Sequence, residues 1–140
     1  MTVLVPILVG ALLVSCGGSS SSGKGYQSPM EMRDALARTG RPCADFSQAA
    51  GNDNAQQSVD QQANCTIGGE KTALITFKDA AQQRDWEAQE QVVYCGLAKA
   101  LNQQTISWVH GSKWAVSPIK ATNGKTIADA IGGRVKTIQC

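Results

Sequence analysis

One histidine and five cysteines are the residues of this 140-residue chain with the most reactive side chains. A hydroxyl nucleophile needs a base, and histidine is the usual one. Ser112 follows His110 by two residues, but that spacing in a turn does not build a catalytic triad, so we expect His110 to be an exposed turn residue. The carboxylates Asp85, Glu87 and Glu90 lie near basic residues on one predicted helix, which indicates a solvated surface rather than an acid–base pair. We therefore predict that the protein is not an enzyme.

Metal, nucleotide and nucleic-acid sites are not predicted either. The cysteines form no C-x-x-C pair and the histidine is far from them, which disfavours zinc. No glycine-rich phosphate loop follows a strand, and Asn52-Asp53-Asn54 lacks the later glutamate of a calcium loop. The net charge is only +2, from 13 Lys+Arg and 11 Asp+Glu, and the basic residues are scattered. We expect no metal, no cofactor and no nucleic-acid partner.

The N-terminus reads MTVLVPILVGALLVS, with an apolar stretch from Val3 to Val14. That length fits the core of a secretory signal and is too short to span a bilayer. The stretch ends in Leu13-Val14-Ser15-Cys16, which resembles the bacterial lipobox. The resemblance implies cleavage before Cys16 and a diacylglyceryl group on its thiol, which would bind the protein to the bilayer. The alternative is an ordinary secretory signal in which Cys16 is incidental.

Four further cysteines remain when Cys16 is the lipid site: Cys43, Cys65, Cys95 and Cys140. In an exported domain they predict two disulfides, with three possible connectivities. We favour Cys43–Cys65 and Cys95–Cys140, because segments that follow one another in sequence most often lie side by side.

Three segments divide the chain. We predict a signal peptide at residues 1–15, the lipidated cysteine and a flexible Gly/Ser tether at residues 16–27, and a single α+β domain at residues 28–140. About 113 residues suffice for one hydrophobic core, which the disulfides would brace.

The first helix is predicted to start at Ser28-Pro29-Met30-Glu31, which combines an N-cap, a proline in the first turn and a capping box. Gly40 is expected to end it. A short strand at Cys43–Phe46 and a polar loop at Gln48–Gln62 follow.

A β-hairpin is predicted from Cys65–Ile67 and Thr72–Phe77 around Gly68-Gly69. In its second strand Ala73, Ile75 and Phe77 alternate with Leu74, so the two sets face opposite sides.

The second helix is expected to begin at Asp79, with Gln82 completing a capping box, and to end or kink at Gly96. Its predicted inward residues are Trp86, Val92 and Val93.

A second hairpin is predicted from Thr105–Val109 and Trp114–Ser117, joined by the four-residue loop His110–Lys113. Trp108 and Trp114 are expected to lie near each other across it. Trp108, His110, Lys113 and Trp114 are therefore a candidate partner-binding surface, because tryptophan on a loop is typical of a binding hot spot. The alternative, which we favour, is that both tryptophans belong to the core.

The last helix is predicted to start at Thr122 or Asn123 and to end at Gly132-Gly133, followed by a strand at Val135–Cys140. The sum is an α+β fold: a small antiparallel sheet with about three helices on one face, braced by two disulfides.

The chain resembles small exported actinobacterial lipoproteins of unknown function, some of them phage- or prophage-encoded. The resemblance rests on the lipobox Cys16, on Gly40-Arg41-Pro42-Cys43, on Cys65 before an apolar strand, and on the run Val109–Val116. It implies location and fold more than activity.

These observations predict a non-enzymatic binding module on the outer face of a bacterial cytoplasmic membrane, with a protein or envelope partner. Anchoring raises the effective concentration of a weak binding surface. The alternatives are a phage or prophage superinfection-exclusion lipoprotein, a small cell-envelope hydrolase, and a ligand carrier. The short chain is expected to leave little volume for a sizeable ligand cavity.

Overall fold

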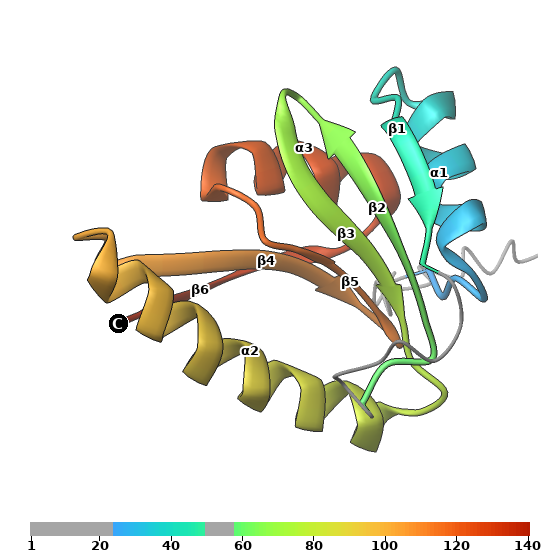
Figure 1. Cartoon of the computed structure of the whole chain (residues 1–140). Helices are drawn as coiled ribbons and strands as arrows, with labels where there is room; N and C mark the ends of the chain where they lie inside the picture. Colours follow the sequence, from blue (N-terminus) through green and yellow to red (C-terminus); the bar gives the residue numbers. More distant parts are fainter. Residues whose placement is uncertain (1–23, 50–57) are drawn as a thin grey trace, which may run out of the picture.

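In the computed structural model, residues 24–49 and 58–140 form a six-stranded antiparallel sheet with helices on both faces (Figure 1). The elements are α1 (Pro29–Arg38), β1 (Ala44–Gln48), β2 (Gln61–Ile67), β3 (Glu70–Thr76), α2 (Ala80–Ala100), β4 (Thr105–Gly111), β5 (Trp114–Ser117), α3 (Ala121–Ile131) and β6 (Arg134–Gln139). The strand order is β1-β2-β3-β5-β4-β6. The predicted α+β class is confirmed, whereas the predicted signal peptide, Cys16 and most of the polar loop lie outside the described residues.

The starts of α1 and α2 are set by local side-chain caps, as predicted. The Ser28 hydroxyl accepts the Glu31 backbone N–H (3.3 Å), and the Glu31 carboxylate accepts the N–H of Gln27 (2.8 Å). Asp79 accepts the Gln82 N–H (2.8 Å), and the Gln82 side chain accepts the N–H of Lys78 (2.8 Å). Each pair satisfies two backbone donors that a helix start leaves without partners.

The helices cover both faces of the sheet, so the expectation of helices on one face is wrong. Helices α1 and α3 pack on one face around Met32, Leu36 and Ile127, while α2 lies across the other (Figure 1). The reason lies in β3, where Leu74 belongs to the first core and Ile75 to the second. A strand that is apolar on both sides needs a layer on both sides.

Helix α2 continues through Gly96 to Ala100, so the predicted end or kink at Gly96 is wrong. Glycine costs a helix only about 1 kcal/mol relative to alanine, which a long helix tolerates. Val92 and Val93 are 75% and 51% exposed, so their predicted inward position is also wrong. The buried residues of α2 are Gln83, Trp86, Glu90 and Ala98. Its N-terminal half thus packs more closely on the sheet than its C-terminal half.

The second hairpin turns over two residues, Ser112 and Lys113, rather than the predicted four. Strand β4 extends to Gly111, which pairs with Trp114. A side chain at position 111 would overlap the Trp114 indole, so the absence of one lets the ring lie across the strand. Lys113, the second residue of this turn, adopts a left-handed backbone conformation with a φ of 63°.

Helix α3 starts at Ala121, slightly before the predicted Thr122 or Asn123. Asn123 does not cap the helix, because its side chain instead donates to the carbonyl of Ile67 in β2 (2.9 Å). The helix ends at Gly132, in a left-handed conformation with a φ of 83°, and β6 follows, as predicted.

Both favoured disulfides are confirmed. Cys43–Cys65 joins the start of β1 to β2, and Cys95–Cys140 joins α2 to the end of β6.

Residues Lys24 to Gln27, which we assigned to the tether, contact the folded domain. Tyr26 is 6% exposed and its hydroxyl donates to the Ile131 carbonyl (2.9 Å). The Trp114 indole N–H donates to the carbonyl of Lys24 (2.7 Å). The domain therefore begins by Lys24, and we call this contact the N-terminal clamp.

Candidate functional site

The four residues of the predicted partner surface do not form one surface. Trp108 and Trp114 are 1% and 0% exposed, so the alternative that both belong to the core is confirmed. They lie in different cores on opposite faces of the sheet, so the expected contact between them is wrong. The register of β4 and β5 is the cause. Trp114 pairs with Gly111, so it lies on the same face of the sheet as Gly111 and Val109. Trp108 is the neighbour of Val109 in β4 and therefore points to the opposite face.

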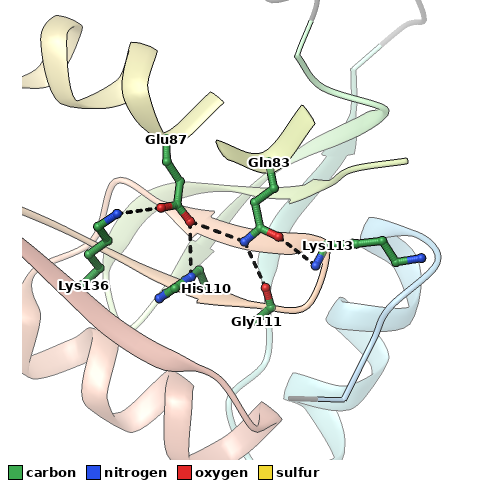
Figure 2. Close-up of polar contacts among 6 residues, drawn as sticks. All are labelled: Gln83, Glu87, His110, Gly111, Lys113 and Lys136. Atoms are coloured by element: carbon green, nitrogen blue, oxygen red, sulfur yellow. Dashed lines mark hydrogen bonds and ion pairs between the residues drawn. The ribbon is translucent and has the colours of Figure 1, made fainter. Parts of the chain in front are cut away.

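His110 lies in β4, and it contacts Glu87 of α2 rather than standing free in a turn (Figure 2). Its Nδ1 is 3.2 Å from Glu87 Oε1, while Nζ of Lys136, from β6, is 2.6 Å from Glu87 Oε2. Lys136 Nζ also lies 5.3 Å from the centre of the Trp108 ring. One carboxylate of α2 thus contacts side chains from two strands.

Gln83, one turn before Glu87, extends the same contacts to the β4–β5 turn (Figure 2). Its amide nitrogen donates to the Gly111 carbonyl (3.0 Å), and its oxygen accepts the Lys113 N–H (2.8 Å). These bonds fasten the N-terminal half of α2 to the hairpin. We call Gln83, Glu87, His110 and Lys136 the polar cluster.

The charge state of Glu87 follows from these contacts. Burial raises the pKa of Glu87, but hydrogen bonds and charges from His110 and Lys136 together outweigh it and lower the pKa to about 2. The carboxylate is therefore ionised at neutral pH and offsets the charge of Lys136.

A carboxylate that orients an imidazole is one half of a catalytic triad. The other half is a nucleophile hydrogen-bonded to the imidazole, and no serine, threonine or cysteine of residues 24–49 and 58–140 makes that bond to His110. What the polar cluster does is hold α2 against β4 and β6.

We expect Glu87→Gln to lower the free energy of unfolding at pH 7 by about 2–3 kcal/mol. The pKa of Glu87 is 4.5 before folding and about 2 after it. The carboxylate therefore stabilises the fold above pH 4.5, and this contribution is lost as the pH falls toward 2. Urea denaturation between pH 7 and pH 2.5 should show a flatter profile for the variant. Asp85→Asn, which changes an exposed carboxylate on the same helix, is the control; equal profiles for both variants would contradict the role of Glu87.

A cleft opens between the C-terminal half of α2 and the sheet. Its volume is about 680 Å³, which exceeds what we expected from the short chain. Its apolar lining includes Leu97 and Leu101 near the end of α2, Ile106 and Trp108 of β4, and Pro118 and Ile119 after β5. We call this hollow the α2 cleft.

Several polar residues line the α2 cleft toward β3: Glu70, Lys71, Tyr94, Ser117 and Lys120. Gln103, Gln104, Thr105 and Ser107 line it as well. Burial, and secondarily the nearby Glu90 carboxylate, raise the pKa of Tyr94, so its hydroxyl keeps its proton. A second hollow, of about 600 Å³, lies beside Lys71, Tyr94 and Ser117 over β2 and β3.

The exposed pair Leu97 and Leu101, spaced by four residues, is the sequence signal for this cleft. The cleft is not predicted from the sequence, because Val92 and Val93 are expected in the core and the helix is expected to end or kink at Gly96. Helix periodicity identifies an apolar face but not whether another layer covers it.

The fold and site define a class: a disulfide-braced α+β domain with an open, mostly apolar cleft. No protein-family model matches the chain, and no curated protein or solved structure is similar enough to match it. In the described part of the chain, no helix has the length and apolar character to cross a bilayer. The same residues contain no group of three or more histidine, cysteine or acidic side chains able to hold a metal ion.

Proposed function

We propose that this protein is a bacterial lipoprotein, anchored by an acylated Cys16 to the outer face of the cytoplasmic membrane, where it acts as a non-enzymatic binding module. The lipobox-like Leu13-Val14-Ser15-Cys16 supports the anchor. The observation that carries the binding role is the α2 cleft, with apolar side chains that the domain itself leaves open.

The position of the cleft relative to the N-terminal clamp suits this role. Strand β4 begins with Thr105, which lines the cleft, and ends with Gly111 (Figure 1). Gly111 pairs with Trp114, whose indole N–H donates to the carbonyl of Lys24. Six residue steps of a strand separate these ends by about 20 Å. The cleft is therefore at the end of the sheet away from the point where the chain leaves toward the anchor.

The anchor also limits how far the domain can move. Eight residue steps lead from Cys16 to Lys24, and a polypeptide can span at most about 29 Å over that length. A cleft confined near the membrane meets envelope ligands at a raised effective concentration, so modest affinity suffices.

The Cys16→Ser variant tests the anchor. We expect the wild-type chain in the membrane fraction, labelled by a palmitate analogue, and the variant unlabelled in the medium. Two acyl chains bind stably to a bilayer, while the domain without them does not. Equal membrane association of an unlabelled Cys16→Ser variant would overturn the proposal.

The same cells can report on the binding role. A photo-crosslinking amino acid at Leu101, on the wall of the cleft, is expected to form adducts that the same group at Val92, outside the cleft on the same helix, does not form. Equal adducts at both positions would mean that the cleft has no special role.

A further inference from the structure

Exposed large apolar side chains are concentrated on one element. Val92, Val93 and Leu97 of α2 and Leu101, its C-cap residue, are 51–75% exposed, and elsewhere in the described chain only Met30 joins them. Leu97 and Leu101 line the α2 cleft, whereas Val92 does not. Contiguous exposed apolar surface beside a hollow is typical of a ligand-binding groove.

The interior of the cleft is also apolar. Ile106 and Trp108 lie on the α2 face of the sheet, and Ala98 is the small buried residue of the helix above them. The Trp108 indole N–H is buried and has no hydrogen-bond partner among the described residues. The volume of about 680 Å³ falls within the range of roughly 300–1,000 Å³ for small-molecule sites.

One end of the cleft carries positive charge. Lys71 and Lys120 line it, are exposed, and make no ion pair within the described chain. Glu70 also lines this end, and its carboxylate accepts the Lys120 backbone N–H (2.9 Å). The neutral hydroxyl of Tyr94 lies beside them as a further hydrogen-bond donor.

We propose that the α2 cleft binds a single-chain amphiphile with an anionic head group, either a free fatty acid or a lysophospholipid. The acyl chain lies along Leu97, Leu101 and Ile106, and the head group lies between Lys71 and Lys120. A mostly apolar lining with two lysines toward β3 matches the two halves of such a molecule. This inference rests on the proposed binding function and names its ligand class.

The test uses the full chain carrying Cys16→Ser, stripped of bound lipid on a hydrophobic resin, in calorimetric titrations below the micelle concentration. Dodecanoate and lauroyl-lysophosphatidylglycerol are the two anionic probes, and their relative affinities identify the source of the head group. Decanoate should bind about 15-fold more weakly than dodecanoate, because each buried methylene strengthens binding about fourfold. Dodecanol and dodecyltrimethylammonium test the need for negative charge.

Three variants locate the site. Leu97→Gln should weaken dodecanoate binding about tenfold by removing apolar contact. Lys71→Gln combined with Lys120→Gln should weaken dodecanoate about fivefold and leave dodecanol unchanged. Val92→Gln, on the same helix but outside the cleft, should bind like the parent chain.

Failure of every anionic probe to bind, or equal weakening by Val92→Gln and Leu97→Gln, would overturn the inference. Equal binding of dodecyltrimethylammonium would overturn the anionic assignment. The outcome for the proposed function is distinguishable from the outcome for the ligand class. If a crosslinker at position 101 captures an envelope protein while no amphiphile binds, the binding role stands and the proposed ligand class is wrong. If Cys16→Ser leaves membrane association unchanged, the anchor is wrong whatever the cleft binds.

Discussion

Replacement of Trp114 by alanine is expected to lower the free energy of unfolding by about 4 kcal/mol, within the range for large aromatic residues in cores. The side chain is 0% exposed and lies across Gly111, with its ring centre 5.5 Å from that of Tyr26 in an edge-to-face contact. Its N–H also holds the carbonyl of Lys24. The variant therefore loses core packing and the N-terminal clamp together.

A more conservative variant separates these two losses. Trp114→Phe keeps most of the ring but removes the donor to Lys24, so it should cost about 1–2 kcal/mol. Trypsin cleavage after Lys24 should become faster in both variants, because the carbonyl of the scissile bond is no longer held. Urea denaturation and timed proteolysis followed by mass spectrometry measure the two effects. Wild-type cleavage rates at Lys24 in both variants would show that the clamp does not form.

The second large effect is expected at the disulfide between Cys95 and Cys140. Replacing both residues by alanine should lower the free energy of unfolding by about 4 kcal/mol, because the bond closes a loop of 45 residues and restricts the unfolded chain. In the folded protein the same bond ties the C-terminal half of α2 to the end of β6. Since Ala98 is the only buried residue of α2 beyond Glu90, this half depends strongly on the disulfide.

The matched control is the pair Cys43→Ala and Cys65→Ala. Its loop of 22 residues predicts a smaller loss, about 3 kcal/mol. Hydrogen exchange should show faster opening of residues 95–101 in the Cys95/Cys140 variant and unchanged rates there in the control. A larger loss of unfolding free energy in the Cys43/Cys65 variant, or equal exchange rates of residues 95–101 in both variants, would contradict the role of the Cys95–Cys140 disulfide in holding α2 to β6.

Features that depend on neighbouring residues could be predicted from the sequence. Ser28 with Glu31 and Asp79 with Gln82 cap their helices through bonds three residues apart, so no distant contact is needed to place them. Gly132 ends α3 because its left-handed conformation suits glycine. The first hairpin and the alternation of Ala73, Leu74 and Ile75 followed in the same way from local pattern.

The candidate site was not predictable in this way. Glu87, His110 and Lys136 come from three elements, and only the strand order brings β4 and β6 together under α2. Trp108 and Trp114 are six residues apart, yet the two-residue turn and the register assign them to opposite faces.

The sequence by itself determined the cysteine inventory, the starts of α1 and α2, the first hairpin and the α+β class, because caps, turns and alternation act over a few residues. The tertiary structure alone decided that helices cover both faces, that α2 runs through Gly96, and that its C-terminal half leaves a cleft beside Trp108. The physical reason is burial. An apolar stripe such as Val93, Leu97 and Leu101 has the same sequence pattern whether or not another layer covers it. Only the packing of distant segments decides which stripe remains exposed.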